Sequence, residues 1–276
     1  MNFDKYQGIG NDFIVVDAKS ARDVSAEQAV KLCHRQFGIG ADGVILVLPP
    51  DDPAHLGRMR VINSDGSVPQ MCGNGLRCVA LHVARTRPQI RTLSEAVYET
   101  DGGLRTCLVE LGPDGASAEV TVDMGPVRIL GDLHLGLADE RSEWAEVELI
   151  TVDVGNPHGV SLRRPSAEII GRIGPRLATH EAFPEGANIG FAHVVDRNFI
   201  DLVVWERGAG LTLACGTGAC AAVGAACSRG LASWGSPVTV KLPGGQLTIS
   251  VDAGGGHAKM RGPAQHVFSG RVDVAG

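Results

Sequence analysis

A cysteine followed at once by a glycine-rich turn occurs twice in this chain, and this repeat constrains the fold more than any other feature. The first copy is Cys-Gly-Asn-Gly at residues 72–75, and the second is Cys-Gly-Thr-Gly at residues 215–218. Apolar residues recur at helical spacing after each motif, so each cysteine should stand at the N-terminus of a helix. About half of the 276 residues separate the two cysteines, which is too long for a solenoid repeat. We therefore expect two similar halves.

The segments before the two cysteines also correspond. Apolar runs predict strands at residues 59–63 and 199–205, and Asn63 and Glu206 each precede their cysteine by nine residues. Two more motif pairs repeat in the same order: Gly-Asn-Asp at 10–12 with Gly-Asn-Pro at 155–157, and Gly-Ala-Asp at 40–42 with Gly-Ala-Asn at 186–188. This order is typical of a duplicated domain.

Periodicity and turn residues predict the remaining elements. Ser25 and Gln28 form a capping-box pattern, and an apolar face that includes Phe37 predicts a helix ending at Gly38. Further elements are expected as follows: strands at 13–16, 44–48, 238–242, 247–251 and 258–261, an antiparallel meander at 95–123, and a helix from Ser166 to about Ala178. We place the first lobe at residues 1–118 and the second at 119–262, with residues 263–276 returning to the first.

Composition and charge narrow the class of protein. The formal net charge of −6 argues against nucleic acid or an anionic membrane as a standing partner. Neither a signal peptide nor a membrane span is recognised. Seven cysteines without the spacing of a secreted disulfide framework favour the cytoplasm. The spacings from Cys72 to Cys78 and from Cys215 to Cys220 do not match a zinc site, so no metal is expected.

Two thiols at helix N-termini suit proton transfer at a stereocentre. The helix dipole and the unpaired N–H groups favour a thiolate and can also hold a carboxylate. If the lobes are related by a pseudo-two-fold axis, Cys72 and Cys215 can face each other across the cleft between them. One thiolate would then remove a proton from a bound carbon, and the opposite thiol would return one to the other face. Packing in the core is the simpler interpretation of the other five cysteines: Cys33, Cys78, Cys107, Cys220 and Cys227.

Six segments together resemble the diaminopimelate epimerase family. They are Gly-Asn-Asp-Phe at 10–13, Asn-Ser-Asp-Gly-Ser at 63–67, Met-Cys-Gly-Asn-Gly at 71–75, Gly-Asn-Pro-His at 155–158, Trp-Glu-Arg-Gly at 205–208 and Ala-Cys-Gly-Thr-Gly at 214–218. The resemblance implies an α+β fold of two pseudo-symmetric lobes, each a mixed, largely antiparallel sheet wrapped around a central helix. It also implies an active site in the interlobe cleft and a homodimer.

The resemblance further implies an activity and a set of site residues. The activity is the cofactor-independent interconversion of L,L- and meso-diaminopimelate on the bacterial route to lysine and peptidoglycan. Cys72 and Cys215 match the acid/base thiols, and His158 and Glu206 match residues that assist thiol ionisation. The positions that match substrate-holding residues are Asn11, Asn63, Asn156, Asn188, Glu206 and Arg207, and the backbone at Gly73, Asn74, Gly216 and Thr217 matches the cradle of the α-carboxylate.

Three positions depart from the family pattern. Gln7 stands where a histidine is common, the segment ending at Gln70 lacks the usual acidic residues, and Leu76 is bulkier than the usual alanine. None of these changes removes a proposed catalytic group. Gln70 and Leu76 flank the Cys72 loop, where we expect them to affect rate and loop order.

Other functions fit part of the pattern. A proline racemase-like protein, such as a hydroxyproline epimerase, would share the lobes and both thiols, but that group has histidine where Asn74 stands and does not need Glu206 and Arg207. Phenazine-biosynthesis isomerases share the fold but lack the thiol pair. A thiol redox sensor or ligand-binding protein could use Cys72 and Cys215 as a switchable disulfide, but it would not need the polar substrate set. We expect oxidation to join the two cysteines as an inactivation.

Overall fold

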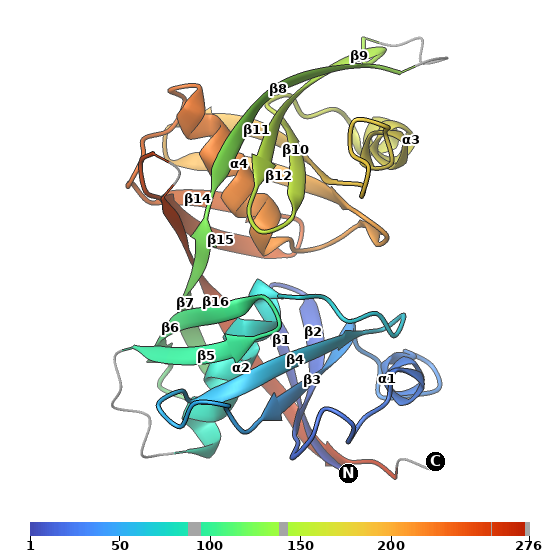
Figure 1. Ribbon diagram of the computed structural model, residues 1–276, viewed down its shortest axis with the longest axis vertical. Coiled ribbons are helices and arrows are strands. Elements are labelled where there is room, and N and C mark those ends of the chain that lie inside the picture. The colour runs from blue at the N-terminus through green and yellow to red at the C-terminus, as the bar shows by residue number, and fades with distance from the viewer. Residues whose placement is uncertain (88–94, 138–142, 255, 274–276) are drawn as a thin grey trace. The chain divides into compact units, whose positions relative to one another are not determined.

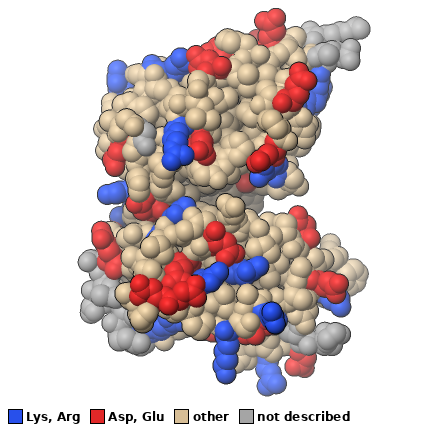
Figure 2. Space-filling model, in the orientation of Figure 1, with Lys and Arg blue, Asp and Glu red and all other residues tan. Residues whose placement is uncertain are grey.

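The computed structural model describes residues 1–87, 95–137, 143–254 and 256–273. The chain divides into two compact units, drawn in Figure 1: unit 1 is Met1–Asp123 with Arg261–Gly276, and unit 2 is Met124–Met260. On the face drawn in Figure 2, acidic and basic side chains are interspersed within each unit. Among the described residues, no helix has the length and apolar character needed to cross a membrane.

Unit 1 is a mixed sheet with two helices. Its elements are β1 (Asn2–Gly8), β2 (Asn11–Asp17), α1 (Ala26–Cys33), β3 (Gly43–Leu48), β4 (Gly57–Asn63), α2 (Gly73–Thr86), β5 (Ala96–Thr100), β6 (Gly103–Leu111) and most of β7 (Ser117–Pro126). Strands β1 to β7 pair in chain order. Among these described pairs, β2–β3 and β4–β5 are parallel and the other four are antiparallel. The C-terminal part of β16 (His257–Arg271) pairs with β1 in the same unit.

Unit 2 repeats this plan. Its elements are β8 (Arg128–Gly136), β9 (Glu146–Asp153), β10 (Pro157–Ser161), α3 (Ala167–Ala178), β11 (Asn188–Asp196), β12 (Phe199–Glu206), β13 (Gly210–Leu211), α4 (Gly216–Ser228), β14 (Val238–Leu242) and β15 (Gly245–Val251). The β10–β11 and β12–β14 pairs are parallel, and they correspond in order to the parallel β2–β3 and β4–β5 pairs of unit 1. The β9–β10, β11–β12 and β14–β15 pairs are antiparallel. The two-lobed, sheet-rich α+β fold expected from the sequence is confirmed.

One buried helix forms the centre of each unit. Helix α2 packs against β1, β2, β3, β4 and β6, and α4 packs against strands from β8 to β15. Residues 218–227 of α4 are all buried, so the helix is covered on every side. Most of these residues are small, so the strands can approach the helix backbone closely. Each sheet therefore surrounds a helix that begins at one of the two repeated cysteines.

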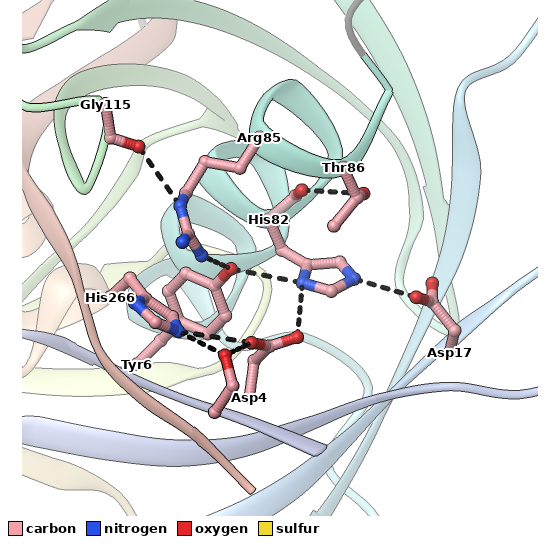
Figure 3. A network of polar contacts seen from close by, with 9 residues as sticks. Asp4, Tyr6, Asp17, His82, Arg85, Thr86, Gly115 and His266 are labelled. Atoms are coloured by element: carbon pink, nitrogen blue, oxygen red, sulfur yellow. Dashed lines mark hydrogen bonds and ion pairs between the residues drawn. The ribbon is translucent and has the colours of Figure 1, made fainter. Parts of the chain in front are cut away.

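A polar network holds the C-terminal half of α2 (Figure 3). His82 is 1% exposed, and its ring lies 3.1 Å from the Tyr6 hydroxyl through Nδ1 and 3.2 Å from Asp17 through Nε2. Arg85 donates to the Tyr6 hydroxyl at 2.7 Å and to the Gly115 carbonyl at 3.1 Å. Burial raises the pKa of Tyr6, so its hydroxyl stays protonated. The network attaches α2 to β1, β2 and the turn before β7.

Two expected element ends were wrong. The capping box of Ser25 and Gln28 is confirmed, but α1 ends at Cys33 instead of Gly38, and Phe37 is 90% exposed. The chain leaves the helix at His34, and the N–H groups of Ile39 and Gly40 donate back to the Leu32 carbonyl. The strand expected at 258–261 is part of the longer β16, because pairing with β1 extends it.

Candidate active site

Cys72 occupies the N-cap position of α2. Its backbone is extended, with φ −139° and ψ 107°, and its sulfur accepts a hydrogen bond of 3.4 Å from the N–H of Gly75. A side chain at position 75 would place Cβ 2.9 Å from Ile45 Cδ1 and 3.4 Å from the Cys72 sulfur. Glycine at this position therefore leaves the room that the thiol and the first helical turn need.

Cys215 occupies the same position at α4. Its φ of −130° and ψ of 102° match those of Cys72 closely. A Cβ at Gly218 would lie 2.9 Å from Val204 Cγ2 and 3.1 Å from the Cys215 sulfur, as at the first site. The two Cys-Gly-x-Gly motifs thus build the same cap, and both cysteines lie at helix N-termini as expected.

The charges around the two sulfurs differ. Cys215 is 4% exposed, and its sulfur lies 3.7 Å from the Thr217 hydroxyl. The Cys215 thiol donates a hydrogen bond to the Glu206 carboxylate. Burial raises the pKa of Cys215 well above its usual value and the charge of Glu206 raises it further, while the Thr217 hydroxyl and the Gly218 N–H act in the opposite direction. Thr212 also donates to the Glu206 carboxylate. Cys215 is therefore a protonated thiol beside a carboxylate.

Polar side chains of unit 1 surround the first cap. Asn74 is 3% exposed and donates through Nδ2 to Asn11 Oδ1 at 3.2 Å, and Asn11 Nδ2 donates to Asp42 at 2.7 Å. Arg77, which is fully buried, donates to Asn74 Oδ1 at 2.8 Å. Asn63, at the end of β4, donates to the Ser67 hydroxyl at 2.9 Å, in the turn that follows the strand.

The polar residues of unit 2 meet where β10, β11 and β12 lie side by side. His158 and Asn188 are register partners in the parallel β10–β11 pair. Asn188 accepts a hydrogen bond of 2.9 Å from the backbone N–H of Arg207, directly after β12. The His158 Nε2 lies 3.0 Å from Asn156 Oδ1, and its Nδ1 has no hydrogen-bond partner among the described residues. Burial, aided by the charge of Arg207, lowers the pKa of His158 to about 3, so the ring is neutral.

The structure thus distributes the expected site residues over the two units. Unit 1 holds Asn11, Asn63, Cys72, Gly73 and Asn74, and unit 2 holds Asn156, His158, Asn188, Glu206, Arg207, Cys215, Gly216 and Thr217. All seven cysteines are free thiols. Burial raises the pKa of Cys33 to about 11 and that of Cys78 and Cys220 to about 12, which fits core packing. The described His, Cys, Asp and Glu side chains form no group that could hold a metal ion.

Comparison with known proteins identifies the family. The diaminopimelate epimerase family model matches residues 3–130 and 150–267. Diaminopimelate epimerase of Gloeothece citriformis is 43% identical, with 99% of each chain covered. The chain belongs to the diaminopimelate epimerase family. The chloroplastic diaminopimelate epimerase of rice is 41% identical over 98% of this chain and 79% of its own. The family expected from the six motifs is confirmed, and its members are isomerases.

Solved structures of proteins with other names share the fold of this chain. A hydroxyproline epimerase from Agrobacterium vitis, solved with trans-4-hydroxy-L-proline, has a TM-score of 0.69 at 19% identity, covering 98% of this chain and 91% of its own. A PhzF-family phenazine biosynthesis protein from Bacillus anthracis has a TM-score of 0.70 at 15% identity, covering 99% and 98%. At these identities the likeness concerns the fold alone.

Sequence reasoning missed three polar residues around the caps: Asp42, Arg77 and Thr212. Arg77 lies between apolar residues of a helix that also carries His82 and Arg85, so its position alone does not distinguish it. A charged residue in such a helix is a signal of a specific partner, because burying a charge without one is costly. Asp42 was noticed only as part of a repeated turn, and Thr212 carries no pattern that distinguishes it.

Proposed function

We propose that this chain interconverts L,L- and meso-diaminopimelate by proton transfer at the α-carbon, with Cys72 and Cys215 as the two acid/base groups. One observation carries the proposal: in a diaminopimelate epimerase family chain, both halves hold a cysteine in the same N-cap geometry. The reaction would lie on the route to lysine and peptidoglycan precursors. All proton transfers use groups of the chain, so the proposal needs neither a cofactor nor a metal.

The chemistry requires one ionised and one protonated thiol. The thiolate takes the α-proton, the C–H electron pair remains on the carbon as a carbanion conjugated with the carboxylate, and the other thiol donates its proton to the opposite face. Backbone N–H groups of Gly73 and Asn74, and of Gly216 and Thr217, are proposed to bind the α-carboxylate. These N–H groups lie at the positive ends of α2 and α4, where they stabilise the negative charge that develops.

The surroundings of Cys215 suggest how a thiol loses its proton. Glu206 cannot stabilise a thiolate electrostatically, because its negative charge raises the pKa of Cys215. It can take the proton directly, since it is hydrogen-bonded to the thiol. Neutral His158 likewise supplies no positive charge, and we propose that it positions Asn156, to which it is hydrogen-bonded.

The distal end of diaminopimelate carries an amino group and a carboxylate, which need acceptors, donors and both charges. We propose that Glu206 and Arg207 bind these two groups, together with the amides of Asn11, Asn63, Asn156 and Asn188. Arg207 is exposed, and its backbone is fixed by the hydrogen bond to Asn188. A proline-type substrate has no second amino-acid group for these residues to bind.

Substrate and cofactor requirement can be tested together by proton NMR. Reduced protein is mixed with L,L-diaminopimelate, a chelator and no pyridoxal phosphate, and a parallel sample holds L-proline and hydroxyproline. We expect the meso isomer to form in the first sample only. Turnover in the second sample alone would move the substrate to a cyclic amino acid, and silence in both would contradict the proposal.

Three cysteine variants test the assignment of the thiols. Cys72→Ala and Cys215→Ala should each abolish epimerisation, because each removes one of the two proton carriers. Cys33→Ala is the control, since Cys33 is a core cysteine that is 3% exposed. Near-normal turnover in either site variant would contradict the two-thiol scheme.

We also propose a cytoplasmic homodimer. The homodimer follows from the family, and a reducing compartment is supported by seven free thiols in a chain that has no disulfide among them. Light scattering should give twice the 28.9 kDa chain mass, and a monomer mass at working concentration would contradict the dimer.

A further inference from the structure

A chain of four hydrogen-bonded side chains runs from Arg77 inside α2, through Asn74 and Asn11, to Asp42. Arg77 donates to Asn74 Oδ1 at 2.8 Å, Asn74 Nδ2 donates to Asn11 Oδ1 at 3.2 Å, and Asn11 Nδ2 donates to Asp42 Oδ2 at 2.7 Å. We call these four residues the amide relay. It lies wholly in unit 1, and only Asn11 is proposed to hold the distal end of the substrate.

The two ends of the amide relay determine the direction of every bond between them. An arginine side chain can only donate, and an ionised aspartate can only accept. Asn74 must therefore turn its oxygen to Arg77 and its nitrogen to Asn11, and Asn11 must turn its nitrogen to Asp42. The orientations of the two amides follow from chemistry and do not depend on telling oxygen from nitrogen by position.

Arg77 and Asp42 are themselves held in place. Arg77 also donates through Nε to the Pro263 carbonyl at 3.1 Å. Gly8 makes room for its guanidinium, because a Cβ at Gly8 would lie 2.8 Å from Arg77 Nη2. Asp42 accepts a hydrogen bond of 2.8 Å from Arg35 and one of 3.1 Å from the backbone N–H of Asp12.

Asn11 is half-buried, and its orientation decides what it can offer to a ligand. One N–H of its amide is used by Asp42, and the second has no acceptor among the described residues. The side chain thus presents a donor, which suits a carboxylate oxygen and not an ammonium group.

Unit 2 has no such relay among its described residues. Cys220 stands at the place in α4 that Arg77 occupies in α2, five residues after the cap. Asn156, which corresponds to Asn11, contacts the Nε2 of His158, and an imidazole nitrogen can donate or accept. The fixed orientation is a property of the first half alone.

We propose that Arg77 is a positioning residue that acts through Asn74 to make Asn11 a hydrogen-bond donor for a substrate carboxylate. This rests on the proposed function, since it assigns a role in binding the same substrate. Loss of Arg77 should weaken binding while leaving Cys72 at the cap, because the hydrogen bond from the Gly75 N–H to the Cys72 sulfur does not involve Arg77. The charge of Arg77 also acts on Cys72, so a smaller fall in kcat is expected as well.

Steady-state kinetics with L,L-diaminopimelate test this role. Arg77→Met should raise KM about tenfold or more, with a smaller change in kcat, as expected for losing a charge-anchored hydrogen bond. Arg77→Lys keeps a donor-only side chain and should recover part of the affinity. Arg85→Met is the matched control: Arg85 lies on the same helix in the Figure 3 network, so this variant should lose stability and keep a wild-type KM.

A double-mutant cycle with Asn11→Ala separates positioning from a general structural effect. If Arg77 acts through Asn11, Arg77→Met should add little to the KM of Asn11→Ala. An equal rise in both backgrounds, or a KM rise of the same size in Arg85→Met, would overturn the proposal. Loss of kcat in Arg77→Met at unchanged KM would also overturn it.

Asn74→Asp tests the relay even if Arg77→Met does not fold. This isosteric change keeps an acceptor for Arg77 but removes the N–H given to Asn11. Asn11 then lies between two carboxylates that both only accept, so the orientation of its amide is no longer fixed. KM should rise as in Arg77→Met, and a wild-type KM would contradict the relay. Absence of any turnover by the wild-type protein would instead count against the proposed function, so the two failures are distinguishable.

Discussion

Cys72 and Cys215 share a backbone position but not an electrostatic environment. A backbone N–H acts on each sulfur, from Gly75 at Cys72 and from Gly218 at Cys215, but Cys215 is also buried beside the carboxylate of Glu206. An N–H donor stabilises a thiolate, and a nearby carboxylate stabilises the thiol. The proposed two-base reaction needs one ionised and one protonated thiol, and the carboxylate beside Cys215 favours the protonated form there.

Glu206→Gln should lower the pKa of Cys215, because it removes the negative charge that opposes ionisation. The pH dependence of Cys215 alkylation by iodoacetamide, followed by peptide mass spectrometry, measures this shift. The midpoint should move to lower pH in the variant, while that of Cys72 in the same samples serves as the internal control. An unchanged or raised midpoint at Cys215 would show that Glu206 does not act on this thiol.

His158 should make the protein sensitive to acid. Its pKa is about 3 in the folded chain, below the usual 6.5, so the unfolded chain binds the proton first as pH falls. Above about pH 6.5, His158 does not change the free energy of unfolding. As pH falls from 6.5 toward 3, protonation of His158 in the unfolded chain lowers that free energy. Between pH 7 and pH 5, the free energy of unfolding should therefore fall in both proteins, and the fall should be about 2 kcal/mol smaller in His158→Gln than in wild type. Urea titrations at the two pH values measure this, and equal losses would mean that the imidazole ionises freely in the fold.

At the scale of elements, sequence patterns predicted the two central helices well. The Cys-Gly-x-Gly turns mark where α2 and α4 begin, and helical spacing marks their course. The end of α1 was wrong because Phe37 fits the helical period, yet backbone bonds to Leu32 turn the chain away first. Such bonds depend on the path of the following loop, which periodicity does not contain.

The candidate site was predictable in its residue types but not in its contacts. The caps and the asparagines repeat at matching places, so a single chain reveals them. The burial of Arg77 depends on the carbonyl of Pro263, far away in sequence, and on the glycine at position 8. The orientation of Asn11 follows from these contacts, so local sequence could not show it.

Helix α2 should depend on the hydroxyl of Tyr6. This group contacts both His82 and Arg85, and Tyr6 is fully buried (Figure 3). Tyr6→Phe leaves the buried His82 ring and the half-buried Arg85 guanidinium without this partner, so the free energy of unfolding should fall by about 1–3 kcal/mol. Arg128→Ala, which breaks an ion pair with Asp153 on the surface, is the control and should change stability by less than about 1 kcal/mol. Urea unfolding measures both, and a neutral Tyr6→Phe would show that the network does not stabilise the helix.

At the scale of the whole molecule, duplication explains the architecture and divergence explains the chemistry. The order of antiparallel and parallel pairs in unit 1 recurs in unit 2. The residues around the two caps differ: Asn63 corresponds to Glu206, and Arg77 corresponds to Cys220. The two caps thus have different polar partners, as the proposed reaction with two distinct proton carriers would require.

The most direct test of the two-base account is the fate of the α-proton in D2O. Reduced enzyme is given L,L-diaminopimelate, and the α-positions of substrate and product are followed at early conversion by NMR and mass spectrometry. The proton removed by one thiol stays on that thiol, and the returned hydron comes from the other, which has exchanged with solvent. We predict that the first meso product carries deuterium at the inverted centre while the remaining L,L substrate keeps its proton. A first product that retains the original proton would mean that a single group carries it across, and would contradict the account.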